Sequence, residues 1–247
     1  MKRLAIVGVF FISNLLGNTD VSTCQTASLS SYEANRSGCV VRDANGIGVL
    51  VFSNFSFTPT GTTTLTAAGI TVTPDPNGLG GGFNFSGFTT YPVTAGQTAS
   101  YQIDYSYLID PGPISAGADI GMDPPFGNSM IQEFLCADSQ LVQTEGGPAC
   151  QIVGTAVNDF SPQKLQVDDT NPPASWTQHR DLTPQVQQFA QIEDLITLTG
   201  GQTLGAGFDS MTATNEVIIP TPEPTTYLLL AGGLLLFGIL RHRRNAV

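Results

Sequence analysis

The stretch YQIDYSYLID, residues 101–110, has a large apolar or aromatic residue at every second position: Tyr101, Ile103, Tyr105, Tyr107 and Ile109. Successive side chains of a β-strand point to opposite faces, so these five side chains share one face of a strand. Because aromatic and β-branched residues fit half-buried pleated surfaces, the stretch predicts a strand with one face on a hydrophobic core.

Several other segments predict strands. The segment 48–59, GVLVFSNFSFTP, places Val49, Val51, Phe55 and Phe57 on one side and Leu50 and Phe52 on the other, which predicts a strand covered on both faces. Four shorter β-prone runs, each bounded by turn residues, also predict strands: GITVTP (69–74), GGFNFSGF (81–88), CQIVGTAV (150–157) and DLITLTGG (194–201).

The segment 184–196, PQVQQFAQIEDLI, is compatible with a helix that starts after Pro184. Alternation through Ile192, Ile196 and Leu198 favours a strand instead. The fold class expected for residues 24–211 is therefore all-β: a single antiparallel β-sandwich of jelly-roll or immunoglobulin-like type. Residues 212–226 are expected to form a Pro-rich linker.

The charge distribution excludes one class of partner. The formal net charge is −11, and five of the nine basic residues lie at the ends of the chain: Lys2, Arg3, Arg241, Arg243 and Arg244. Between residues 24 and 222, four basic residues face 18 acidic ones. Such a surface repels phosphate backbones, so no nucleic-acid partner is expected.

The N-terminus predicts export. Residues 1–23 carry two cations, then a mostly apolar segment, then small and polar residues, which is the layout of a secretory signal peptide. A membrane anchor that is never removed is the alternative. An exported chain with an even number of cysteines is expected to form disulfides.

The four cysteines form two local pairs, Cys24 with Cys39 and Cys136 with Cys150. Three pairings are possible, and the local one is favoured, with about 3 kcal/mol of stabilisation for each bond in the chain-entropy model. A thiolate metal site does not fit, because the chain has no C-x-x-C and only His179 lies outside the C-terminal tail.

Few residues could carry catalysis. His179 and Asp181 could act as a general base and its orienting group, but no G-x-S-x-G motif accompanies them, and an exposed polar strand is the simpler interpretation. No enzyme activity, cofactor or metal is expected. The alternative is calcium bound by carboxylates beside turns, although none matches the EF-hand pattern: Asp110, Asp119, Asp123, Asp168 and Asp169.

Aromatic side chains could stack on sugar rings. Trp176 and Tyr91 are available for this, whereas the tyrosines of 101–107 share a face with Ile103 and Ile109 and are expected in the core. Carbohydrate binding therefore stays a class-level alternative without assigned residues.

The C-terminal stretch 221–247, TPEPTTYLLLAGGLLLFGILRHRRNAV, has three parts in order. Pro222-Glu223-Pro224 comes first, an apolar run from 227 to 240 follows, and a basic tail over 241–247 ends the chain with Arg241, Arg243 and Arg244. As a helix the apolar run would be about 21 Å long, shorter than the roughly 30 Å hydrocarbon core of a bilayer.

This arrangement closely resembles the sorting signal of PEP-CTERM proteins. The resemblance implies that an exosortase recognises the tripeptide, that residues 227–240 hold the precursor in the inner membrane of a Gram-negative bacterium, and that the basic cluster stays cytoplasmic. The cytoplasmic cluster agrees with the positive-inside rule. An ordinary single-pass anchor is the alternative.

The resemblance implies an exported surface or extracellular-matrix protein with a structural or adhesive role in the envelope or biofilm. A carbohydrate-binding module of the exopolysaccharide matrix, with or without calcium, is the second hypothesis. An envelope hydrolase that uses His179 and Asp181 is the third.

Overall fold

The computed structural model of the chain describes residues 21–42, 49–62, 65–76, 80–88, 93–109, 114–123, 125, 127–152, 158–168, 176–202 and 205–218. Most of the predicted signal segment lies outside these residues, as do the sorting tripeptide, the apolar run 227–240 and the basic tail. No helix in the part of the chain that the structure describes is long and apolar enough to cross a membrane.

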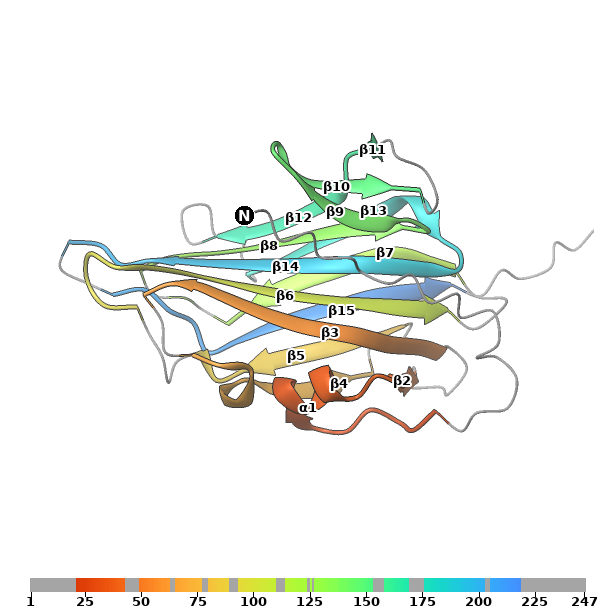
Figure 1. Cartoon of the computed structure of the whole chain (residues 1–247), viewed down its shortest axis with the longest axis horizontal. Helices are drawn as coiled ribbons and strands as arrows, with labels where there is room; N and C mark the ends of the chain where they lie inside the picture. Colours follow the sequence, from red (N-terminus) through yellow and green to blue (C-terminus); the bar gives the residue numbers. More distant parts are fainter. Residues whose placement is uncertain are drawn as a thin grey trace, which may run out of the picture.

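Two six-stranded sheets face each other (Figure 1). The front sheet has the strand order β12 (Gln163–Asp168), β8 (Asn128–Ala137), β14 (Phe189–Thr199), β6 (Thr98–Ile109), β3 (Val49–Gly61), β2 (Cys39–Arg42). The back sheet has the order β1 (Ala27–Ser28), β4 (Thr71–Asp75), β5 (Gly80–Ser86), β15 (Ser210–Ile218), β7 (Ile114–Met122), β13 (Thr177–Val186).

All pairs of these strands are antiparallel, so the described residues form the predicted antiparallel β-sandwich. The chain passes from one sheet to the other at each step from β5 to β8 and again from β12 to β15. Three smaller elements complete the domain: a three-stranded arm of β9 (Gln140–Thr144), β10 (Gly147–Gln151) and β11 (Asn158–Phe160), helix α1 (Leu29–Ala34) and the 3₁₀ turn η1 (Ala67–Gly69).

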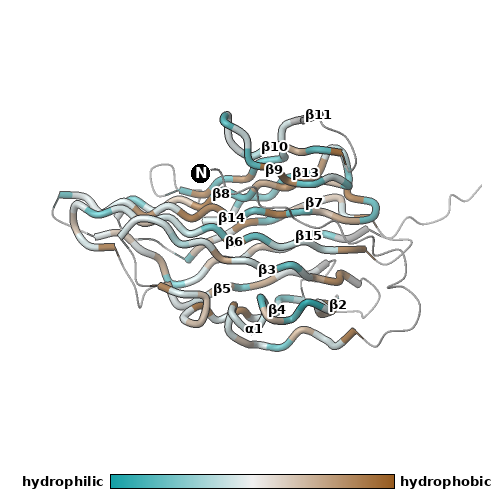
Figure 2. Tube along the Cα trace, viewed as in Figure 1, coloured by the Kyte–Doolittle hydropathy of each residue, from teal (hydrophilic) through white to brown (hydrophobic). Residues whose placement is uncertain are grey.

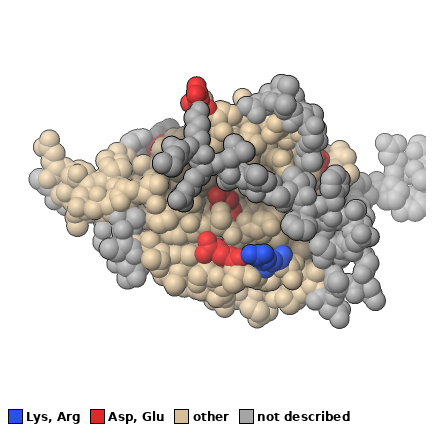
Figure 3. Space-filling model, in the orientation of Figure 1, with Lys and Arg blue, Asp and Glu red and all other residues tan. Residues whose placement is uncertain are grey.

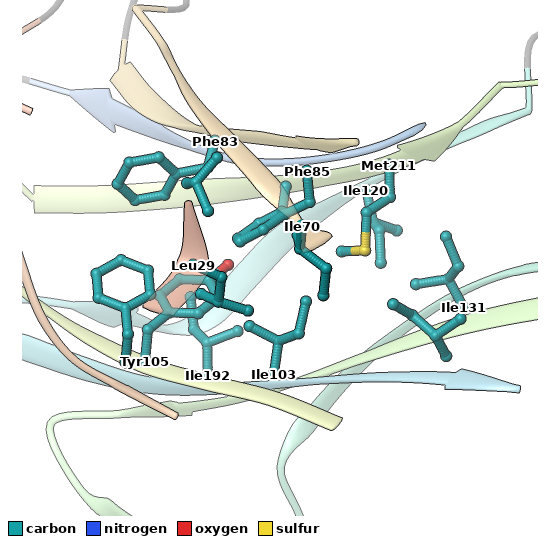
Figure 4. Close-up of a cluster of buried hydrophobic side chains, with 14 of the residues drawn as sticks. Leu29, Ile70, Phe83, Phe85, Ile103, Tyr105, Ile120, Ile131, Ile192 and Met211 are labelled. Atoms are coloured by element: carbon teal, nitrogen blue, oxygen red, sulfur yellow. The ribbon is translucent and has the colours of Figure 1, made fainter. Parts of the chain in front are cut away.

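The hydrophobic core lies between the two sheets, as the alternation of residues 101–109 predicts. In β6 every second residue from Ala99 to Ile109 is buried, and the residues between them are partly exposed. Figure 2 shows the same alternation of hydropathy along the strands. Figure 4 shows side chains of the two sheets meeting in the core, with Leu29 of α1 beside them.

Strand β3 corrects one prediction. Leu50, Phe52 and Phe55 are all buried in the core, so the two sides of the strand are not equally covered. The reason is a bulge: Asn54 has a φ of 59°, and the pairing with β6 shifts between Ser53 and Ser56. One extra residue reverses the alternation, which turns Phe55 to the same face as Phe52.

The ambiguous segment 184–196 is extended, which confirms the strand prediction. Strands β13 and β14 are joined at Gln187 and Gln188. The Asp138 carboxylate accepts hydrogen bonds from the backbone N–H groups of Gln187, Gln188 and Phe189, at 2.8 Å from Gln188 to Oδ1. This carboxylate satisfies turn donors that have no partner within a strand pair.

The predicted linker begins too early. Strand β15 runs from Ser210 to Ile218 between β5 and β7, and Met211, Ala213 and Asn215 are buried. Residues 212–218 therefore belong to the domain. Small and polar residues conceal this strand, because only every second one faces the core.

Candidate functional site

Alternation along β14 places two neighbouring acidic residues on opposite faces of the front sheet. Glu193 points outward and lies opposite Asp104 of β6. Directly opposed like charges destabilise a sheet unless other groups compensate them. The side-chain nitrogen of Gln102 compensates by donating to Asp104 Oδ1 and to Glu193 Oε2, at 2.9 Å in each case, and Ser56 Oγ donates to Asp104 Oδ2 at 2.9 Å. We call Asp104 and Glu193 the outer pair.

The arm packs over the outer pair. The Leu141 N–H donates to Gln191 Oε1 at 2.8 Å, the Gln143 amide donates to Glu193 Oε2, and the disulfide Cys136–Cys150 joins β10 to β8. Glu193 is consequently only 2% exposed. The second predicted disulfide, Cys24–Cys39, joins the N-terminal segment to β2.

Burial changes the acidity of the outer pair. Loss of water raises the pKa of Glu193 to about 7, the neighbouring Asp104 adds to the rise, and the hydrogen bond from Gln143 opposes it. Burial also raises the pKa of Asp104, against the hydrogen bonds from Gln102 and Ser56. Glu193 can therefore exchange a proton close to neutral pH.

Amide side chains continue the polar surface across the front sheet. Gln132 donates to Gln166 Oε1 at 2.8 Å, and Gln166 donates to Asp168 Oδ2 at 2.8 Å. In Figure 3, which faces this sheet, few Lys, Arg, Asp or Glu side chains are visible among the described residues. We call this surface the front platform; it consists of Ser56, Gln102, Asp104, Gln132, Gln166 and Asp168.

A second carboxyl pair, which is not among the candidates predicted from the sequence, lies in the core. Asp194 of β14 is opposite Glu133 of β8, and both are fully buried. Among the described residues, their carboxyl oxygens and the Tyr105 hydroxyl have no hydrogen-bond partner outside this group of three. The signal was present in the sequence, because Glu133 follows the alternation of Ile131 and Leu135, both buried. We call Glu133 and Asp194 the inner pair.

Burial raises the pKa of both inner carboxyls well above their ordinary values. For Glu133 the neighbouring Asp194 and the more distant Asp119 add to this rise. For Asp194 an interaction with Tyr105 opposes the rise, and Asp104 and Glu193 add to it. Burial in this dry position disfavours a charge on either carboxyl, and the contacts of Asp194 with Tyr105 and Glu133 oppose this effect only in part.

The structure brings His179 and Asp181 together on the outer face of the back sheet, as their spacing predicts. His179 Nδ1 lies 2.9 Å from Asp119 Oδ1, and Nε2 lies 3.4 Å from Asp181 Oδ1. The hydrogen bond with Asp119 is the main cause that raises the pKa of His179, against slight burial. Both ring nitrogens thus face carboxylates.

The acidic turns do not gather into one site. Asp119 contacts His179, Asp123 accepts from Ser210 Oγ at 2.6 Å, and Asp168 accepts from Gln166, while Asp110 and Asp169 lie outside the described residues. Within the described ranges, no group of three or more His, Cys, Asp or Glu residues is placed to hold a metal ion.

Trp176 does not form an exposed sugar platform. Trp176 is partly buried and packs against the core, and Tyr91 lies outside the described residues. The sorting tripeptide Pro222, Glu223 and Pro224 also lies outside them and follows the end of β15 at Ile218 after three residues.

Residues 220–244 match the family model of the PEP-CTERM protein-sorting motif. The chain therefore carries this motif, which implies exosortase processing of an exported, membrane-anchored precursor. A comparison with curated proteins gives no match.

Two solved structures show a distant likeness. One is a family 11 carbohydrate-binding module from Clostridium thermocellum in complex with a β-1,3-1,4-mixed-linked tetrasaccharide, at 10% identity and a TM-score of 0.27, over 81% of this chain and 99% of that chain. The other is the enzymatically active domain of bacteriophage CBA120 tailspike protein 4, at 16% identity and a TM-score of 0.21, over 67% of this chain and 19% of that chain. Neither likeness is strong enough to support a functional inference.

Proposed function

We propose that this chain is an exported surface or matrix protein whose β-sandwich has a structural or adhesive role, without catalysis, in the envelope or biofilm of a Gram-negative bacterium. The observation that carries the proposal is the sorting motif at residues 220–244, directly after a folded domain that ends at Ile218. The two disulfides support export, because such bonds persist in oxidising compartments. The repeated crossings between the sheets favour the jelly-roll class over the immunoglobulin class.

The lack of catalysis is supported by the histidine cluster. His179 is the one histidine between the two terminal segments, and its two nitrogens face Asp119 and Asp181. A hydrolase that used this residue would need one nitrogen free for its nucleophile. The proposal therefore predicts that His179→Ala changes no activity of the cells that produce the protein.

Processing can be tested in a cell that contains an exosortase. The variant Glu223→Ala should stay in the membrane fraction at full length, whereas the unaltered chain should appear shortened at the cell surface or in the matrix. Glu145→Ala, in the turn between β9 and β10, is a matched control for removal of one carboxylate. Equal shortening of the chain and of Glu223→Ala would contradict the proposal.

A second candidate function is binding of a matrix polysaccharide on the front platform. The observation that favours it is the row of amide, hydroxyl and carboxyl groups over Ser56, Gln102 and Asp104, since such groups exchange hydrogen bonds with sugar hydroxyls. Asp104→Ala should then weaken retention on the producer's polysaccharide about tenfold or more, equivalent to about 1.4 kcal/mol.

His179→Ala, on the opposite sheet, serves as the control for this binding. If a calcium chelator abolishes retention on the polysaccharide, this result would favour calcium-dependent binding. Equal retention of the chain and of Asp104→Ala would remove the front platform as the binding surface.

A further inference from the structure

Strand β15 fixes which end of the sandwich is attached to the sorting motif. Ile218 pairs with Ile114, the first residue of β7, and Ser115 of β7 pairs with Val186 at the end of β13. The Ile109 N–H donates to the Gln188 carbonyl oxygen at 2.9 Å, which places the end of β6 there too. The β13–β14 turn and the last residues of β6 and β15 therefore share one end of the domain, which we call the β15 end.

The opposite end is defined by equally direct contacts. Met122, the last residue of β7, pairs with Met211 near the start of β15, and its N–H donates to the Trp176 carbonyl oxygen at 3.0 Å. From Met211 to Ile218 the strand rises about 23 Å, at roughly 3.3 Å per residue. Trp176 is the single tryptophan of the chain, so it reports on this far end alone.

The connection to the motif is short. Three residues separate Ile218 from Pro222, so the distance between these two residues is at most about 14 Å. The apolar run starts at Tyr227, nine residues after Ile218, a span of at most about 32 Å. A central strand held between β5 and β7 cannot extend this reach without breaking the back sheet.

We propose that the β15 end faces the inner membrane in the precursor and is the surface presented to the processing enzyme, while the Trp176 end points away. This rests on the proposed function, because it requires a membrane-anchored precursor. With the opposite orientation, Ile218 would lie at least about 23 Å from the membrane, and the nine-residue connection would have to use most of its maximum reach of about 32 Å along the outside of the domain. With the β15 end inward, the connection needs no such extension.

The unique tryptophan makes the orientation measurable in the full-length chain. The precursor is placed in lipid vesicles that carry dansyl headgroups, and energy transfer is measured from Trp176 and from the variant Trp176→Phe/Gln187→Trp. Gln187 is exposed in the β13–β14 turn, so its replacement disturbs no core contact. Transfer should be at least about twofold more efficient from position 187, because that position is about 23 Å closer to the membrane.

Two controls keep the outcomes distinct. Trp176→Phe/Gln188→Trp reports on the same turn and replaces the first variant if that one does not fold. A Gly-Ser insertion of ten residues between Ile218 and Pro222 adds a flexible span of about 16–19 Å and should reduce the difference between the two positions.

Equal transfer, or more from Trp176, in chains that float with the vesicles would overturn the orientation while leaving membrane anchoring intact. A chain that does not float with the vesicles would contradict the anchored precursor itself, and the orientation with it.

Discussion

Two carboxyl pairs lie on opposite faces of the same strand of the front sheet, and their surroundings differ. The outer pair, Asp104 and Glu193, receives hydrogen bonds from Gln102, Ser56 and Gln143. The inner pair, Glu133 and Asp194, is fully buried beside Tyr105 and has no other hydrogen-bond partner among the described residues. Adjacent residues of β14 thus carry one carboxyl that receives hydrogen bonds from amide side chains and one that receives none from them.

The face of the strand on which a carboxyl lies, rather than its residue type, therefore decides its surroundings and its pKa. The pKa of Glu193 is raised to about 7, whereas the pKa values of both inner acids are raised well above their ordinary values, in each case mainly by burial. The carboxyl of Asp104 lies on the front platform, whereas the arm covers Glu193. The inner pair makes the stability of the domain depend on pH.

The largest expected effect comes from the inner pair. The two carboxyls of the inner pair have raised folded-state pKa values, so they do not lower the free energy of unfolding below about pH 4. As pH rises toward those pKa values, the free energy of unfolding falls by up to about 1.4 kcal/mol per pH unit for each carboxyl. Asp194→Asn should make this fall less steep, because one of the two carboxyls is removed. Urea unfolding at a series of pH values measures it, and an unchanged slope would mean that the inner pair ionises in the fold.

A smaller effect is expected from Glu193→Gln. The pKa of Glu193 is raised from its ordinary value of 4.5 to about 7. Ionisation of Glu193 therefore lowers the free energy of unfolding only between these two pH values, by at most about 3 kcal/mol. The variant should flatten the stability profile between these limits and run parallel to the unaltered chain above pH 7. A change of slope above pH 7 would show that the two pairs titrate together.

Gln102→Ala tests the contribution of the hydrogen-bond donor that the two outer carboxyls share. Loss of an amide that serves both outer carboxyls should cost about 1–2 kcal/mol and raise the pKa of Asp104 further, since this hydrogen bond lowers it. Carboxyl NMR titration measures the shift. Gln132→Ala, on the same face but bonded to Gln166, is the matched control and should leave Asp104 unchanged.

The smallest effect is expected at His179. Its ring is 47% exposed, so solvent screens the contacts with Asp119 and Asp181, and His179→Gln should cost less than about 1 kcal/mol. Because the pKa is raised above 6.5, this small contribution is present at acidic pH and disappears as pH rises through the folded-state pKa. Unfolding at pH 6 and pH 9 measures the difference, and a larger loss at pH 9 would reverse the sign.

Much of the fold could be predicted from local patterns. The alternation of residues 101–109, the extended segment after Pro184 and both disulfides follow from the sequence. The bulge at Asn54 could not be predicted, because it depends on one left-handed residue within an apolar run. Strand β15 is hard to recognise because Thr212 and Thr214 occupy outward positions and the polar Asn215 occupies an inward one.

The candidate sites were harder to predict. The spacing of His179 and Asp181 predicts that these two side chains lie together. It does not predict the contact of His179 with Asp119, which is sixty residues away in the sequence. The outer pair likewise joins β6 to β14 and depends on the arm for its burial. Such contacts are set by sheet register, which local periodicity does not specify.

The central claim is that a folded domain ending at Ile218 is exported and then processed at the motif that follows it. The most direct measurement is the mass of the C-terminal peptide of the protein recovered from the envelope and matrix of the producing cell. The account predicts a terminus near Pro222–Pro224, with residues 227–247 absent and any added mass identifying the group attached there. A terminus intact through Val247 would contradict it and would make the apolar run a permanent anchor.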